Sequence, residues 1–164
     1  MKQILSKINI KRVLYYALYM FLALVCQNMI FPQFRIFGIC PMALPAVAVA
    51  VGMFEGATWG SVFALIMGVF ADMSFVENTT MFTVLFPAIA FASGFISQFF
   101  INRRFFAYMF TAFAALLITA ALQMLKLVLI DGWAANMLLT VLLQAVFSLP
   151  AAVLAYFPPA EWIE

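Results

Sequence analysis

Long apolar runs separated by short polar breaks make up almost the whole chain. About 20 apolar residues in an α-helix cross the roughly 30 Å of a bilayer's hydrocarbon core. The runs are continuous, unlike the period-two alternation of a membrane β-barrel strand. The pattern therefore predicts an all-α integral membrane protein with about six transmembrane helices in one compact bundle. We expect the spans at about 13–31, 36–54, 57–72, 80–101, 105–130 and 134–157.

The second and third spans are the least regular. Pro41 and Pro45 fall within the second span and indicate a late helix start or a kink. Glu55 and Gly56 leave only a tight connection to a short third span. One alternative is a single re-entrant element formed by both segments, but we expect each to be a full or nearly full span.

Polar residues and prolines mark the later spans as well. Pro87 lies in the middle of the fourth span, and the basic turn Asn102-Arg103-Arg104 follows that span. Lys126 interrupts the fifth span late, and Asp131-Gly132 is expected to turn the chain into the sixth.

Composition supports a membrane location for the single domain over 1–164. Of the residues, 68% are hydrophobic and 9% are charged, whereas a soluble domain is about half apolar and a quarter charged. The chain has no histidine, and its two cysteines, Cys26 and Cys40, are not in a CxxC arrangement. We find no nucleophile–base pair, phosphate loop or metal-ligand set. We therefore expect no catalysis, cofactor, metal or nucleic-acid partner.

The basic residues predict the orientation. Cytoplasmic loops of membrane proteins carry the excess of lysine and arginine. With the N-terminus in the cytoplasm, the outer segments hold only Arg35 and Lys126. The inner segments then hold Lys2, Lys7, Lys11, Arg12, Arg103 and Arg104. We therefore expect both termini to be cytoplasmic, with the basic side chains setting topology and lying near anionic lipid.

The first apolar run is expected to remain in the protein. It is too long for a signal peptide, and no small-residue cleavage site closes it.

The third span carries a glycine stripe that ends in an acid. Gly56, Gly60, Gly68 and Asp72 are separated by multiples of four residues, which keeps them near one face of a helix. Gly94 in the fourth span follows Ala90 at the same spacing. Small residues let membrane helices approach closely. Two interpretations remain: packing within the bundle, or contact with a partner protein.

The stretch GVFADMSFVENTT, residues 68–80, raises the question of why Asp72 ends an apolar run. It is consistent with a helix-end acid that reaches water, a buried ion with a partner, or a proton or cation site with a second acid. We favour the first, in which Asp72 closes the third span and 78–80 opens the fourth by capping it.

The remaining polar residues have ordinary explanations. Gln98, Gln123 and Gln144 are single amides in apolar spans, and such residues hydrogen-bond between helices. Lys126 either pairs with Asp131 or extends its ammonium group towards the interface.

Tryptophan favours the membrane–water interfaces. We accordingly expect Trp59, Trp133 and Trp162 there.

The region from Glu55 to Arg104 resembles the bacterial rod shape-determining MreD family. Gly68 and Asp72, in GVFADMS, match that family's helix-end motif, and Gly94 matches its later glycine. The basic turn INRRFF, the chain length and the lysine-rich start also fit. The chain departs from the family in the loop after the acid, where 75–78 replace a glycine-containing sequence.

The resemblance implies a non-enzymatic scaffold of the bacterial cell-elongation and peptidoglycan-synthesis complex, in the cytoplasmic membrane. The implied partners are MreC, a RodA-type glycosyltransferase, a class B penicillin-binding protein, and MreB indirectly. Asp72 would then fix the outer end of the third span, where MreC docks.

A second resemblance is to the substrate-binding S components of energy-coupling-factor vitamin transporters. These proteins also have six helices and a glycine-rich helix that ends in an acid before an outer loop. Their first span, however, has small alanine faces, whereas this chain has Tyr15, Tyr16, Tyr19, Met20 and Phe21 there.

Overall fold

The structure is a computed structural model that describes residues 10–34, 38–74, 80–99, 105–132 and 136–156. Within these ranges the chain is helical apart from short connections, of which the segment before α3 is the longest. The elements are α2 (Ile10–Val25), the π-helix η1 (Cys26–Ile30), the 3-10 helix η2 (Phe31–Gln33), α3 (Leu44–Glu55), α4 (Ala57–Ser74), α5 (Met81–Phe99), α6 (Phe105–Asp131) and α7 (Asn136–Ala155). The all-α prediction is confirmed.

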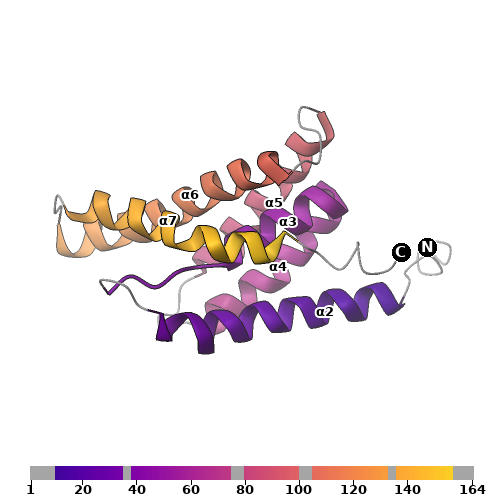
Figure 1. The fold of residues 1–164 in the computed structure, drawn as a ribbon, viewed down its shortest axis with the longest axis horizontal. Helices are drawn as coiled ribbons and strands as arrows, with labels where there is room; N and C mark the ends of the chain where they lie inside the picture. The colour runs from indigo at the N-terminus through magenta and orange to yellow at the C-terminus, as the bar shows by residue number, and fades with distance from the viewer. Residues whose placement is uncertain (1–9, 35–37, 75–79, 100–104, 133–135, 157–164) are drawn as a thin grey trace.

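Five of the described helical segments are long and apolar enough to cross a membrane, and the sixth helix, α3, is shorter. The protein is therefore a multi-pass membrane protein. Successive segments run back and forth along the long direction of the bundle (Figure 1), so α2 begins and α7 ends at the same end. The Tyr19 hydroxyl donates to the Ala155 carbonyl at 2.9 Å near that end.

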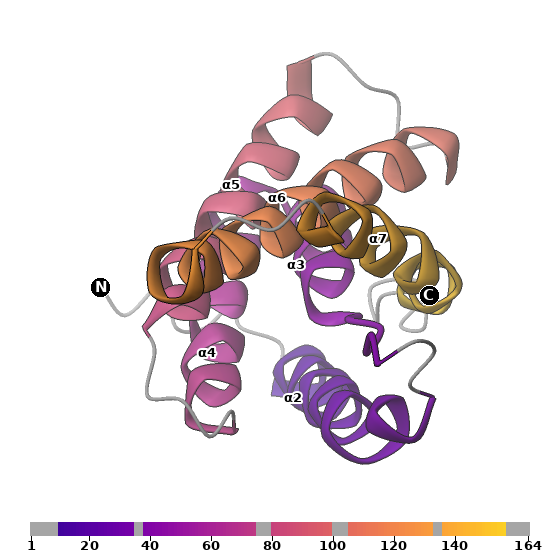
Figure 2. The same ribbon diagram turned by 90° about the vertical axis from the view of Figure 1, so that its left-hand side faces the viewer.

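Helix α3 forms the centre of the bundle. Every residue from 41 to 53 is buried, and α3 packs against α4, α5, α6 and α7. Figure 2 shows α3 between these helices. Its sequence, LPAVAVAVGMFE, is apolar around the whole circumference until its last residue. A helix without a polar face is stable only where it is covered on all sides, which explains its central place.

The second expected span differs most from the structure. We expected a helix from about 36, but α3 begins at Leu44, and residues 40–43 are not helical. Pro45 stands at the second helical position, where its missing N–H would have had no helical partner anyway. Pro41 disfavours helix in the residue before it. The late start suggested by the prolines is thus confirmed.

Helix α3 is shorter than an ordinary span. Its 12 residues rise about 18 Å, which is less than the roughly 30 Å of hydrocarbon. The chain therefore passes through 40–43 in a non-helical form, inside the bundle, before α3 begins.

The tight connection between the second and third spans is present. Only Gly56 separates α3 from α4. Its φ of 89° is a conformation that glycine adopts easily and other residues rarely do.

Helix α6 continues through Lys126 to Asp131. Lys126 therefore interrupts the apolar run but not the helix.

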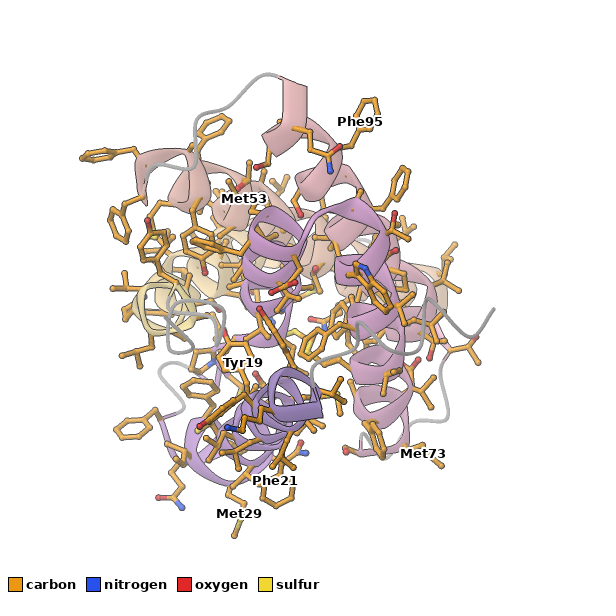
Figure 3. The ribbon with its side chains drawn as sticks, turned by 90° about the vertical axis from the view of Figure 1, so that its right-hand side faces the viewer. Tyr19, Phe21, Met29, Met53, Met73 and Phe95 are labelled. Atoms are coloured by element: carbon orange, nitrogen blue, oxygen red, sulfur yellow. The ribbon has the colours of Figure 1, made fainter. Side chains whose placement is uncertain are left out.

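The outer surface is made of large apolar side chains. Residues more than half exposed occur on every long helix, including Leu14, Val84, Phe110 and Leu154. In Figure 3 the side chains of Phe21, Met29, Met73 and Phe95 point outward, while Tyr19 points from α2 into the bundle. Lipid tails are the natural environment of such a surface, since hydrocarbon imposes no penalty on exposed apolar groups.

Candidate functional site

The entry to α3 is a break in regular structure deep inside the bundle. Backbone groups within a membrane must find partners in the protein, since hydrocarbon offers none. The side chain of Gln27 in η1 supplies two such hydrogen-bond partners. Its Oε1 accepts the N–H of Ala43 at 2.8 Å, and its Nε2 donates to the carbonyl of Pro41 at 3.2 Å. One amide side chain thus replaces two of the hydrogen bonds that a helix would have made.

Ser148 of α7 hydrogen-bonds to the backbone of Met42, which lies between Pro41 and Ala43. Its Oγ accepts the N–H of Met42 at 2.9 Å and donates to the Gln144 carbonyl at 2.7 Å. Gln27 is 5% exposed and Ser148 is fully buried. Two helical segments far apart in sequence, η1 and α7, therefore both hold the non-helical segment 41–43.

The polar contacts continue from α7 to α6. Gln144 Nε2 donates to Gln123 Oε1 at 3.2 Å, and Gln123 Nε2 lies 3.6 Å from the Met42 sulfur. These two glutamines thus make a hydrogen bond between helices, as we expected of single amides in apolar spans. Together with Gln27 and Ser148 they form what we call the entry network: Gln27, Ser148, Gln144 and Gln123 around the backbone of 41–43.

Gln98 has a different environment. It is exposed near the end of α5. A Cβ added at Gly56 would lie 3.3 Å from its Nε2, so Gln98 lies beside the α3–α4 turn.

Asp72 lies inside α4 and caps the N-terminus of α5. Its Oδ1 accepts the N–H of Phe82 at 3.1 Å, and its Oδ2 accepts both the N–H and the hydroxyl of Thr83, at 2.8 and 2.6 Å. The side chain is 8% exposed. A carboxylate here satisfies the free donors of a helix N-terminus and meets the positive end of the helix dipole. The expectation of a helix-end acid that reaches water is therefore wrong. Asp72 is buried before the last residues of α4, and its carboxylate joins two helices.

The structure describes only one of the three residues, 78–80, that were expected to cap the fourth span. Residues 78 and 79 lie outside the described residues, and Thr80 is exposed. Among the described residues, Asp72 of the preceding helix caps α5.

The glycines of the stripe lie where backbones meet. An added Cβ would stand 2.5 Å from the Gly52 Cα at Gly60, 2.6 Å from the Phe82 carbonyl oxygen at Gly68, and 2.6 Å from the Ala57 Cα at Gly94. Real Cβ atoms do not come this close to backbone. The geometry places these three glycines in helix packing within the bundle: Gly60 between α4 and α3, Gly68 between α4 and α5, and Gly94 between α5 and both α4 and α3.

Gly56 differs from the other glycines. It forms the turn after α3, where its N–H donates to the Gly52 carbonyl at 3.1 Å.

Tyrosine hydroxyls join α2 and α6 to α3 and α7. The Tyr108 hydroxyl of α6 lies 2.7 Å from the Ala152 carbonyl of α7 and 3.4 Å from the Ala46 carbonyl in the first turn of α3. The Tyr16 hydroxyl donates to the carboxylate of Glu55. The rings of Phe105 and Tyr156 pack edge to face with centroids 5.0 Å apart. Tyrosine hydroxyl bonds and an edge-to-face contact between aromatic rings thus join these helices.

The structure describes only some of the basic residues that predicted the orientation. Lys7, Arg103 and Arg104 lie outside the described residues, as do Lys2 and Arg35. Lys11 is exposed in the first turn of α2, and Arg12 follows it in that turn. The side chains of Lys126 and Asp131 lie outside the described part, so the proposed pair stays a prediction.

Of the tryptophans, Trp59 is 59% exposed in the first turn of α4. Trp133 and Trp162 lie outside the described residues.

The described residues contain no group of three His, Cys, Asp or Glu side chains that could hold a metal ion. Within the same ranges, every fully buried side-chain nitrogen and oxygen has a hydrogen-bond partner. Cys26 and Cys40 are not joined in a disulfide and are each partly buried, and the Cys40 sulfur lies 3.6 Å from the Pro41 carbonyl oxygen.

Gln27, Ser148 and Gly52 are the important residues that sequence reasoning missed. Gln27 and Ser148 are single polar residues in apolar runs, the same signal that identified Gln123 and Gln144. Gly52 lies four residues after Ala48 and four before Gly56, the spacing that drew attention to Gly94, so a local signal for it was present. Its close contacts are on α4 and α5.

No family model, curated protein or solved structure matches the chain.

Proposed function

We propose that this chain is a non-enzymatic membrane scaffold of the bacterial cell-elongation machinery, located in the cytoplasmic membrane. It would bind MreC and link it to a RodA-type glycosyltransferase and a class B penicillin-binding protein. The cytoplasmic filament protein MreB would be reached indirectly, and membrane lipid would surround the bundle.

The observation that best supports this proposal is the joint role of the residues behind the family resemblance. Gly68 packs against the backbone of Phe82 and Thr83, and Asp72 caps those same two residues. Gly94 packs the other end of α5 against α3 and α4. A motif that locks α4 and α5 into one rigid pair is what a scaffold needs to present a fixed surface.

The engagement of the buried polar groups also favours a scaffold. The polar side chains of the entry network hold the chain's own backbone at 41–43 and each other. A vitamin-binding S component needs polar groups that face a ligand. Partners would instead contact the outward helix faces, such as the one on α4 that carries Trp59, Val62 and Ile66.

The first experiment is purification of the tagged protein from its native membrane in mild detergent, with mass spectrometry of the co-purified proteins. The expected result is enrichment of MreC with a RodA-type polymerase. A companion depletion experiment should convert rods to round cells. Cells that stay rod-shaped after depletion would contradict the proposal.

A matched pair of variants locates the partner surface. Val62→Ala with Ile66→Ala shortens two outward side chains on α4, and Val84→Ala with Phe91→Ala does the same on α5. Loss of MreC with one pair only would identify the docking face. Recovery of a transmembrane coupling protein with paired ATPases would instead replace the scaffold by the transporter alternative.

A further inference from the structure

Helix α2 is attached to the bundle differently from the other long helices. Of the most apolar stretch within Val13–Gln33, 11% is buried, against 33% for α4, α5 and α6 and 22% for α7. Among the residues of α2 and η1 whose burial is described, Tyr19 and Gln27 are the two buried ones. Figure 2 shows α2 set below α3, between α4 and α7, with the other helices gathered on the far side of α3.

Three polar side chains on one stripe of α2 and η1 reach into the bundle. Tyr16 bonds to the Glu55 carboxylate at the end of α3. Tyr19 bonds to the Ala155 carbonyl at the end of α7. Gln27 bonds to the backbone of 41–43. Between them, Met20, Ala23 and Leu24 pack only partly buried against the core.

The two ends of this attachment are not equivalent. The Gln27 amide satisfies a donor and an acceptor of non-helical backbone inside the bundle, and these groups have no substitute in hydrocarbon. The tyrosines bond to the last residues of α3 and α7, Glu55 and Ala155. A partly exposed carboxylate at a helix end can be hydrated when its tyrosine leaves. The Tyr16 bond is therefore easier to release than the Gln27 bonds, and Tyr19 makes a single further hydroxyl bond to the last residue of α7.

A hinge is built in at the other end. Residues 26–30 form a π-helix and 31–33 a 3-10 helix. Changes from α to π and 3-10 geometry interrupt the regular hydrogen-bond ladder and mark sites where helices bend. Gln27, whose side chain holds the backbone of 41–43, lies inside the π-helix itself.

We propose that α2 is a hinged strap: it pivots at η1, with Gln27 as the fixed point, and its N-terminal half opens away from α3 and α7 when the Tyr16 and Tyr19 hydroxyl bonds are released. The closed state is the one in the structure. Opening uncovers the side of α3 that α2 covers. This inference does not depend on the proposed scaffold function.

The test uses pairs of spin labels in the full-length protein in nanodiscs, read by double electron–electron resonance. Cys26 and Cys40 are first replaced by alanine. One pair, Leu14→Cys with Leu154→Cys, spans the tyrosine end of α2 and the end of α7, and both sites are at least 70% exposed. The other, Met29→Cys with Leu139→Cys, reports on the hinge end from exposed positions.

Tyr16→Phe combined with Tyr19→Phe removes two hydroxyls and keeps both rings, so packing is preserved. Hydrogen bonds between membrane helices are modest, and the loss of two should raise the ratio of open to closed molecules about tenfold. The 14–154 distances should broaden towards longer values, while the 29–139 distances stay unchanged. Tyr15→Phe, at an exposed position on the same helix, should change neither.

Unchanged 14–154 distances in the double variant would overturn the proposal, because packing alone would then hold the helix. Equal broadening of both pairs would also overturn it, because α2 would then detach as a whole. The single variants Tyr16→Phe and Tyr19→Phe should give intermediate shifts, which keeps the test valid if the double variant folds poorly.

Discussion

Asp72 and Thr83 are joined by two hydrogen bonds to one carboxylate oxygen. Oδ2 of Asp72 accepts the N–H of Thr83 at 2.8 Å and its hydroxyl at 2.6 Å, while Oδ1 takes the N–H of Phe82. The acid that ends an apolar run thus fastens the end of α4 to the start of α5. This arrangement explains its place in the sequence without chemistry or a bound ion.

Replacement of this acid should loosen the α4–α5 pair. Asp72→Ala leaves buried N–H groups of α5 without an acceptor, and we expect the free energy of unfolding to fall by about 2 kcal/mol. Asp72→Asn keeps the acceptor oxygen and should lose less. Reversible unfolding in mixed detergent and SDS measures both.

The matched control for this site is Ser74→Ala. The Ser74 hydroxyl bonds only within its own helix, to the Phe70 carbonyl at 2.7 Å, and is exposed. It should unfold like the unchanged protein. An Asp72→Ala variant as stable as this control would contradict the capping role.

The glycine contacts should not tolerate a methyl group. At Gly60 an added Cβ would lie 2.5 Å from the Gly52 Cα, so α3 and α4 would have to separate. Such overpacking costs about 1–3 kcal/mol, and Gly60→Ala should lower the thermal unfolding midpoint in detergent accordingly.

A bulkier residue on the lipid side provides the comparison. Ala92 is exposed on α5, and Ala92→Leu should leave the unfolding midpoint nearly unchanged. If Gly60→Ala were equally neutral, the close approach of α3 and α4 would be absent in the membrane.

The entry network should be most sensitive at Gln27. Gln27→Leu removes the partner of a buried carbonyl and a buried N–H, and we expect a loss of about 2–4 kcal/mol in the free energy of unfolding. Hydrogen exchange of the Ala43 amide should accelerate in parallel. Gln33→Leu is the control, since Gln33 is exposed and bonds only to the Met29 carbonyl nearby. Equal free energies of unfolding for the two variants would contradict the stabilising role of the Gln27 hydrogen bonds to 41–43.

The Gln123–Gln144 bond can be isolated by a double-mutant cycle. Interhelical bonds of this kind in membranes average about 0.6 kcal/mol, and we expect a coupling of that size from Gln123→Leu, Gln144→Leu and the double variant. A coupling of zero would mean that the two amides do not pair.

The sequence by itself determined the membrane location, the all-helical fold and most helix bounds. Continuous apolar runs can satisfy their backbone in hydrocarbon only as helices, so length and composition are sufficient. The third to sixth expected spans agree with α4–α7 to within a few residues. The same local information indicated Gly60, Gly68 and Gly94 as positions of close approach, because only small residues permit it, but it left open whether the approaching backbone belonged to the bundle or to a partner.

Tertiary structure decided what those residues touch. Gln27 and the backbone of 41–43 lie in different segments, and Ser148 lies on the other side of α3. No local pattern links them, because their pairing follows from where α3 is buried. Helix α3 could be short only because other helices supply its missing hydrogen bonds. Asp72 similarly could be identified as a helix-end acid from its neighbours, but its partners on α5 depend on how two helices meet in space.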